Sequence, residues 1–319
     1  MKKTLLFIAA FFFAAQAFST IRLVPGGYAT IQAALTAAVS GDTIQVSSGT
    51  YTEKNLTLGT VKSITLKGAG IGQTTVQAFA TPNNTPAASC SVFNLDGAYS
   101  SAITITLQDM TIQNGYNSSN GGGIRFTNTG TVAPTLNFTN LKIASNIGLA
   151  GGGIYISGFA TTTISGCNIT ANTGSSVTAG NGGGIYISPG TNKLLSATIK
   201  NSTISFNTSG YLGGGMMVQC SGDANNLISN QLNHSLIIEN TTIYKNSCIT
   251  ATKSGGGIEF RQAGSSSTYC SHTVKLNHCT IECNKTNGDP GGDGVCFENN
   301  YNTTLIMNNS IVMGNSGAT

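Results

Sequence analysis

Apolar residues recur in a strand-like alternation from about residue 102 onward, and each alternation follows a run of glycines. The first apolar position holds Ile124, Ile154, Ile185, Met216, Ile258 and Val295. The second, two residues later, holds Phe126, Ile156, Ile187, Val218, Phe260 and Phe297. The residues between them vary in character, and they are Arg125, Tyr155, Tyr186, Met217, Glu259 and Cys296. This alternation predicts strands that bury one face and turn the variable residue outward.

A second element alternates with the first, and it consists of Ile or Val followed three residues later by asparagine. The asparagines are Asn146, Asn172, Asn207, Asn246, Asn284 and Asn315. The positions eight and ten residues before each asparagine are also mostly apolar, as Phe138 and Leu136 illustrate. We therefore expect three short strands in each repeat, two of them close together and the third opened by the glycines. Loop lengths vary between repeats, whereas these anchors do not.

A repeat of this length with three short strands cannot bury its own apolar face, so the pattern predicts a solenoid. Stacked coils pair edge to edge at about 4.7–4.9 Å, and equivalent residues then form columns. The apolar columns would form one continuous core. The asparagines would lend their amides to neighbours one coil away as an internal ladder, and the glycines would supply positive φ or close backbone approach.

The N-terminal part predicts a signal peptide, a cap and the first coils. Lys2 and Lys3 precede an apolar run, and Ala15-Gln16-Ala17 fits a signal cleavage site. We assign residues 1–17 to a signal peptide, residues 18–101 to the cap and first coils, and residues 102–319 to a repeat region that continues beyond the C-terminus. Thr30 is the expected N-cap of a short helix whose apolar face covers the open end of the stack. The mature protein is expected to be secreted or at the cell surface, with no transmembrane segment after cleavage.

Composition narrows the possible partners. Charged residues make up 8% of the chain and the formal net charge is +4. Lys and Arg are scattered singly after the first residues, which argues against nucleic-acid binding. The eight cysteines in an exported chain are open to two interpretations, disulfides or buried free thiols.

The two recurring elements resemble the repeats of polymorphic outer membrane proteins, which are bacterial surface β-helices. The glycine element matches closely, whereas Ile or Val usually replaces the leading Phe of that family's second element. The segment from the helix through Gly49, Tyr51 and Glu53 resembles the N-terminal cap of pectin-lyase-like proteins. This resemblance implies a right-handed parallel β-helix, an all-β solenoid with a short N-terminal capping helix.

Candidate chemistry is sparse. Tyr51 and Glu53 match a motif of pectin methylesterases, but the acids and Trp expected to follow are missing, so we interpret both as structural. Asp289 and Asp293 form the densest acidic turn and are the candidate Ca²⁺ ligands. No other cofactor and no catalytic residue is predicted. Glu259 and Arg261 are expected to point together toward solvent, either as a surface ion pair or as an acid beside the Arg base of a lyase.

The outward residues are the candidate binding surface for a polysaccharide or a host or cell-surface protein, and they are Arg125, Tyr155, Tyr186, Glu259 and Arg261. An ice-binding solenoid would need Thr-x-Thr rows on one flat face, and the runs at residues 161–163 and 241–242 predict no such row. The favoured function is a structural or adhesin-like β-helix. The alternative is a polysaccharide lyase or hydrolase with its acids assembled across coils.

Overall fold

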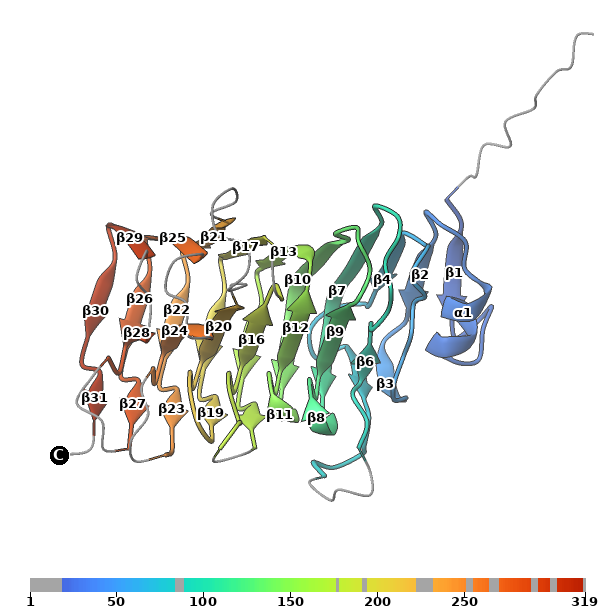
Figure 1. The fold of residues 1–319 in the computed structure, drawn as a ribbon. Helices are drawn as coiled ribbons and strands as arrows, with labels where there is room; N and C mark the ends of the chain where they lie inside the picture. Colours follow the sequence, from blue (N-terminus) through green and yellow to red (C-terminus); the bar gives the residue numbers. More distant parts are fainter. Residues whose placement is uncertain are drawn as a thin grey trace, which may run out of the picture.

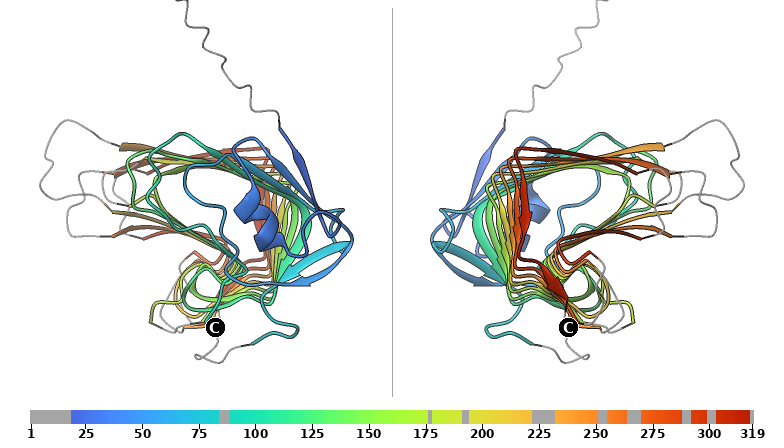
Figure 2. Two further views of the ribbon diagram at one scale, coloured as in Figure 1. Left: turned by 90° about the vertical axis from the view of Figure 1, so that its right-hand side faces the viewer. Right: turned by 90° about the vertical axis from the view of Figure 1, so that its left-hand side faces the viewer.

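The computed structural model describes residues 19–83, 89–175, 178–190, 194–221, 232–250, 255–263, 270–287, 292–298 and 303–317. Over these residues the chain winds into a stack of coils, and each repeat contributes strands to three parallel sheets (Figure 1). Viewed along the stack, the coils superimpose around one axis (Figure 2). The predicted parallel β-helix is therefore confirmed.

We call the three sheets the large sheet, the glycine-led sheet and the short sheet. The large sheet contains β1 (Ile21–Val24), β2 (Thr43–Val46), β3 (Gly49–Thr52), β4 (Ile64–Lys67), β5 (Thr74–Gln77), β7 (Thr104–Gln113), β10 (Thr135–Ala144), β13 (Ala160–Ser165), β14 (Asn168–Thr170), β17 (Leu195–Lys200), β18 (Thr203–Ser205), β21 (Leu232–Glu239), β22 (Thr242–Tyr244), β25 (Cys270–Asn277), β26 (Thr280–Glu282), β29 (Thr303–Asn308) and β30 (Ile311–Met313). The glycine-led sheet contains β6 (Phe93–Asn94), β9 (Ile124–Asn128), β12 (Ile154–Gly158), β16 (Ile185–Ser188), β20 (Met216–Ser221), β24 (Ile258–Ala263) and β28 (Val295–Glu298). The short sheet contains β8 (Tyr116–Asn120), β11 (Ile147–Ala150), β15 (Thr173–Gly174), β19 (Thr208–Ser209), β23 (Ser247–Cys248), β27 (Lys285–Thr286) and β31 (Ser316–Gly317).

The large sheet bends once in every repeat, which divides it into a first limb and a second limb. The bend residue has φ between 43° and 66°, and the bend residues are Asp109, Asn140, Gly166, Asn201, Asn240, His278 and Asn309. Asn, Asp, His and Gly are the residue types that tolerate this left-handed conformation best. In β7 and β10 one strand runs through the bend, and in later repeats it separates into two strands.

Every predicted apolar anchor occupies its expected column. Ile154 pairs in parallel register with Ile124 and Ile185, and Phe138 pairs with Ile164. The residues of these columns are buried in one continuous core along the axis, up to the partly buried Val295 and Phe297. The short sheet was not predicted, because its two- to five-residue strands carry no repeated apolar pattern.

The helix α1 (Ile31–Ala37) covers the N-terminal end of the stack, as predicted (Figure 2). The Thr30 hydroxyl accepts the N–H of Ala33 at 3.1 Å. The Glu53 carboxylate accepts the N–H groups of Ile31 and Gln32 at 2.8 and 3.0 Å. These bonds satisfy donors that a helix leaves open at its N-terminus, so Glu53 has the structural role expected of it.

A second carboxylate, that of Asp42, fixes the first strand to the cap. It is fully buried and accepts the N–H groups of Val39 and Thr20, and its Oδ2 lies 2.6 Å from Arg22 Nε. Burial alone would raise the pKa of the Asp42 carboxyl. The Val39 and Thr20 hydrogen bonds and the Arg22 guanidinium outweigh burial, and they hold this pKa below its usual value.

This lowered pKa predicts an acid-sensitive cap. Asp42 stabilises the fold above its unfolded-state pKa of about 3.9, and the contribution disappears as the pH falls through the lower folded-state value. The difference in free energy of unfolding between the wild type and Asp42→Asn should therefore shrink as the pH is lowered from 6 to below 4. Urea denaturation across this range measures it, and a difference that stays constant with pH would contradict the assignment.

The six repeated asparagines form the predicted ladder inside the core. Asn146, Asn172, Asn207, Asn246 and Asn284 are 0% exposed. In a representative step, the Asn172 backbone N–H and its Nδ2 both donate to Asn207 Oδ1 at 3.0 Å. Asn172 Nδ2 also donates to the Ile143 carbonyl at 2.8 Å. The same bonds recur up to Asn315, so each amide joins three neighbouring coils.

The third glycine of each run makes room for this ladder. A Cβ built on Gly184 would lie 2.6 Å from the Gly215 carbonyl oxygen and 2.9 Å from Asn207 Nδ2. Real Cβ atoms do not approach other atoms so closely, and Gly153 and Gly215 face Asn172 and Asn246 in the same way. The first glycine of each run has a positive φ, for example +62° at Gly182. The two sequence elements therefore recur together because they pack on each other.

We expect Asn207→Ala to lower the free energy of unfolding by about 1–3 kcal/mol, because it strands buried donors on Asn172 and a buried acceptor at Ile169. Asn168→Ala, at an exposed position of β14, is the matched control and should change stability by less than about 0.5 kcal/mol. Chemical denaturation of both variants compares the two losses. Equal losses would mean that the ladder does not stabilise the fold.

The structure distinguishes in part between the two interpretations of the cysteines, which were disulfides or buried free thiols. Cys90, Cys167, Cys248, Cys279, Cys283 and Cys296 are free thiols, and the side chains of the other two cysteines lie outside the described residues. Cys167 is buried, and burial raises its pKa to about 11. In this part of the chain the buried thiols pack as small apolar side chains.

Candidate functional site

The variable residues of the glycine-led strands form one column, the outward column, which points away from the core. Its members are Arg125, Tyr155, Tyr186, Met217, Glu259 and Cys296, and each pairs in register with the next. The alternation predicted from the sequence is thus confirmed. The column occupies the face of β9, β12, β16, β20, β24 and β28 that lies opposite the buried anchors.

The expectation that this column is exposed is wrong at its centre. Tyr186 is 8% exposed, and Met217 and Glu259 are 0% exposed. A second apolar cluster of Ala150, Leu212, Tyr186 and Met217 covers it, with Tyr155 and Tyr211 packed alongside. Ala150, the last residue of β11, and Leu212, which follows β19, each directly precede a glycine run. Their side chains pack against the outward face of the sheet, so the centre of the column fills a small second core.

The two stacked tyrosines belong to this second core. The rings of Tyr155 and Tyr186 lie parallel, with centroids 5.1 Å apart and 7° between their planes. The Tyr186 hydroxyl donates to Gln219 Oε1 on the neighbouring strand at 3.2 Å. Tyr155 is only partly buried, so one edge of the stack reaches the surface. The geometry is that of cross-strand aromatic packing.

Charged groups lie at the two ends of the column, and their pairing differs from the prediction. Arg125 Nε donates to Asp96 Oδ2 at 2.6 Å, and both side chains are partly exposed. Arg261 pairs with Glu298 on the next strand at 3.6 Å, not with Glu259. Strand alternation does place Glu259 and Arg261 on one face, but the Glu259 carboxylate lies back against Gly255 and is buried there.

The predicted calcium ligands are described in part. Asp289 lies outside the described residues. Asp293 takes the place of the second glycine in its run, and its Oδ1 accepts the Thr286 backbone N–H at 3.1 Å and the Thr286 hydroxyl. Over the described ranges, no group of three His, Cys, Asp or Glu side chains could hold a metal ion. Calcium binding at this turn stays a prediction.

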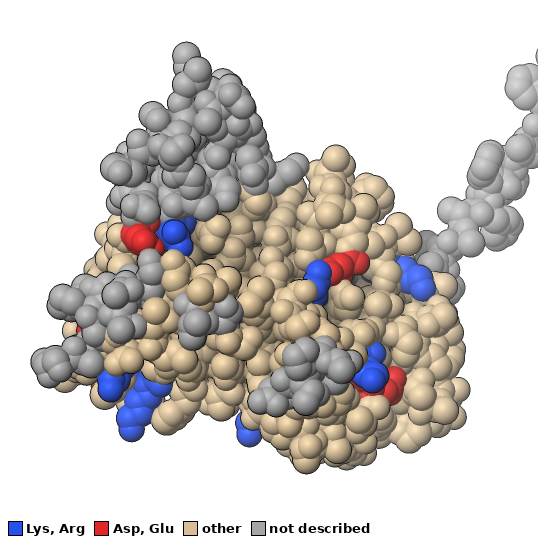
Figure 3. All heavy atoms as spheres, turned by 60° about the horizontal axis from the view of Figure 1, so that its bottom comes forward, with Lys and Arg blue, Asp and Glu red and all other residues tan. Residues whose placement is uncertain are grey.

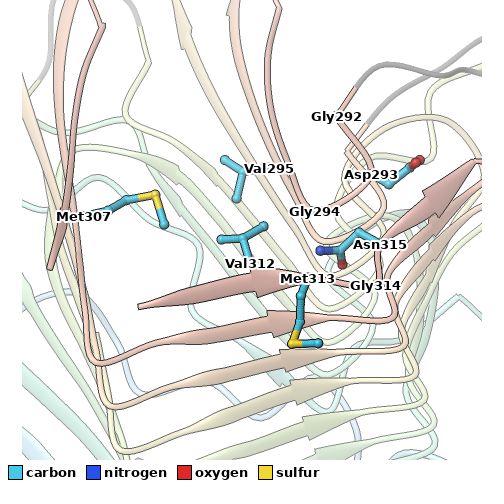
Figure 4. A pocket seen from close by; sticks show the side chains of 9 residues that line it. All are labelled: Gly292, Asp293, Gly294, Val295, Met307, Val312, Met313, Gly314 and Asn315. Carbon is cyan, nitrogen blue, oxygen red and sulfur yellow. The ribbon is translucent and has the colours of Figure 1, made fainter. Parts of the chain in front are cut away.

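A hollow of about 490 Å³ lies at the C-terminal end of the described coils. Figure 4 shows Val295, Met307 and Val312 around it, while the Asp293 carboxylate points away. These three apolar residues are members of the core columns. The hollow is therefore the axial continuation of the core. Among the lining side chains that Figure 4 draws, the ladder residue Asn315 is the polar one that lies beside it.

An exposed aromatic cluster lies on the corner between the second limb and the short sheet. The Phe206 ring is 52% exposed and meets the Tyr244 ring edge-on, with centroids 5.6 Å apart and 90° between planes. The Lys245 ammonium lies 4.8 Å from the Tyr244 centroid and 5.8 Å from the Phe206 centroid. A hydrogen bond to Tyr244 raises the pKa of Lys245. We call these three residues the aromatic corner.

The aromatic corner holds an unusual backbone. Phe206 has φ of 55° and Lys245 has φ of 50°, a region that costs residues with a Cβ about 1–2 kcal/mol. Each directly precedes a ladder asparagine, and the left-handed residue is part of the turn that directs that asparagine inward. Ser145, Ala171 and Cys283 repeat the conformation at the equivalent positions. This corner could not be predicted from the sequence, because an isolated Phe before an Asn carries no repeated pattern.

A regular polar surface lies on the outer face of the first limb. On β7, β10, β13 and β17 two outward positions per strand stand in register, and we call these eight residues the hydroxyl array: Thr104, Thr106, Thr135, Asn137, Thr161, Thr163, Ser196 and Thr198. The first column continues through Ser235 to Thr273, whereas the second changes to Ile237 and Lys275. The expectation that no Thr-x-Thr row exists is therefore wrong. Unequal loop lengths conceal the alignment in the sequence.

Charged side chains are few on the face shown in Figure 3 and lie as single residues and small groups. Over the described ranges, no helix is long and apolar enough to cross a bilayer.

Comparison with known proteins agrees with this architecture. A family model described as "Right handed beta helix region" matches residues 122–319, well over half of the chain. The protein therefore belongs to the right-handed β-helix family, which assigns a right-handed winding to the coils. No curated protein matches the sequence.

Three solved structures give a measure of similarity. A PL6-family alginate lyase is 12% identical, with a TM-score of 0.44, over 94% of this chain and 40% of its own length. A pectate lyase is 12% identical, with a TM-score of 0.43, over 87% of this chain and 78% of its own. The A-module of a mannuronan C-5 epimerase from Azotobacter vinelandii is 15% identical, with a TM-score of 0.21, over 91% and 94%. The chain thus spans less than half the length of the alginate lyase.

The burial of the outward column predicts a stability role for Tyr186. Tyr186→Ala should lower the free energy of unfolding by about 3–5 kcal/mol, because it opens a cavity beside Met217 and removes the stack. Tyr155→Ala, at the partly exposed partner ring, should cost less. Urea denaturation of both variants measures the order. A Tyr186→Ala loss within about 0.5 kcal/mol would restore the interpretation of an exposed platform.

Proposed function

We propose that this protein is a secreted or cell-surface β-helix with an adhesin-like role, and that it binds polysaccharide at the aromatic corner. The secreted location is supported by the basic start and apolar run of the N-terminus. The repeat type is supported by the pairing of the glycine and asparagine elements, which resembles the repeats of polymorphic outer membrane proteins. A host or cell-surface protein is the other partner class for the same surface.

The observation that carries the proposal is the exposed Phe206 ring beside the Lys245 ammonium. Exposed aromatic rings offer a flat apolar face with little conformational entropy to lose, and sugar rings stack on such faces. The ammonium adds a positive charge that a sugar carboxylate can approach. The left-handed turn at Phe206 places a large apolar side chain in solvent, where it is 52% exposed.

Binding to immobilised acidic and neutral polysaccharides tests the proposal. We expect retention on an acidic polysaccharide, and we expect Phe206→Ala and Lys245→Gln each to weaken it. Ile249→Ala is the matched control, because Ile249 is 50% exposed and lies outside the aromatic corner. Retention that is absent from the wild type, or that survives both corner substitutions, would count against the aromatic corner.

The carbohydrate-active enzyme remains the second candidate, and one observation favours it. Arg261 and Glu298 lie on two neighbouring strands of one sheet and form a partly exposed guanidinium–carboxylate pair 3.6 Å apart. Incubation with the same polysaccharides, followed by assay of unsaturated and reducing ends, separates this candidate from simple binding. Product release that disappears in Glu298→Gln would favour an enzyme.

A further inference from the structure

The hydroxyl array has a two-dimensional regularity that no other outward face of the described coils shares. Neighbouring strands of a sheet lie about 4.7–4.9 Å apart, and alternate residues of one strand lie about 6.6–6.8 Å apart. Four successive rungs form the array, and three of them hold hydroxyl groups at both positions, while β10 holds Thr135 and the amide of Asn137. The equivalent face of the second limb is interrupted by Lys142, Tyr244 and Glu282.

The hydroxyls of this array are available to water. Within the described residues, no hydrogen bond engages a hydroxyl of the array. Each hydroxyl therefore binds its own water, and the water positions inherit the spacing of the array. The threonine methyl groups between the hydroxyls limit the other orientations that this water can adopt.

The backbone below the array is rigid and nearly free of charge. Ile105, Phe138, Ile164 and Ile199, on the inner face of the same four strands, are 0% exposed in the core, so the outer face cannot shift independently. The array has no ionised side chain of its own, and Lys200 on β17 and Lys67 on the neighbouring β4 are charges at its edge. A surface of this kind does not attract a charged ligand. It matches a partner that is itself an uncharged, repeating lattice of oxygen atoms.

We propose that the hydroxyl array binds ice. The oxygen lattice of hexagonal ice repeats at separations similar to the two spacings of the array, so water ordered on the array can act as a template for the crystal surface. Loss of the apolar hydration around the methyl groups adds to the attraction. This activity uses a different face from the aromatic corner and does not depend on polysaccharide binding.

Ice-affinity partitioning of the mature protein, together with microscopy of ice crystals grown in its presence, tests the proposal. We expect the wild type to be enriched in the ice fraction and to shape growing crystals. Thr163→Lys places a long charged side chain in the middle of the array and should abolish both effects. Thr203→Lys, the same substitution on the outer face of the second limb, is the matched control and should retain them.

Circular dichroism and the thermal unfolding midpoint of both variants verify that each is folded before the comparison. The proposal is overturned if the wild type stays in the liquid at the level of serum albumin, or if Thr163→Lys keeps its ice affinity. It is also overturned if Thr203→Lys loses as much as Thr163→Lys. Crystalline chitin and cellulose are assayed in parallel, and binding to them through Thr163 without ice affinity would assign the array to a polysaccharide.

Discussion

The asparagine ladder is the interaction on which the rest of the architecture depends. A buried amide without partners is costly, and each ladder amide avoids this cost only when the coils on both sides hold the same residue at the same height. This requirement fixes the register of the whole stack. It also explains the third glycine, whose missing Cβ leaves space for the amide of the next coil. The residue before each asparagine adopts a left-handed conformation to direct it inward, even where that residue is Phe206 or Lys245.

The interior of the protein could be predicted from the sequence, because its constraints repeat. Ile154, Phe138 and Asn207 were each placed in the correct column from spacing alone, and the capping helix was found from its apolar face and Thr30. The short sheet could not be predicted, because residues such as Thr173 and Gly174 pair through their backbone and show no side-chain pattern. Register in that sheet follows from the ladder asparagine just before it.

The surface was predicted less well, for two physical reasons. Tyr186 and Met217 do point away from the core, but Ala150 and Leu212 pack against them, and such contacts leave no period in the sequence. Conversely, Thr135 and Thr163 do form neighbouring columns, but loops of unequal length separate them along the chain. Strand alternation predicts the side of the sheet, whereas exposure depends on whatever else packs there.

The ladder also has a direction. In every step from one ladder amide to the next, the side-chain nitrogen donates to the amide oxygen of the C-terminal neighbour, while its second hydrogen bond goes back to a main-chain carbonyl of the N-terminal coil. Each coil therefore has a donor side and an acceptor side, and any two coils of this kind can be joined. A gene that gains or loses one whole repeat would alter the length of the solenoid without breaking the asparagine ladder. Any outer face that recurs from coil to coil would lengthen or shorten by one row in the same event.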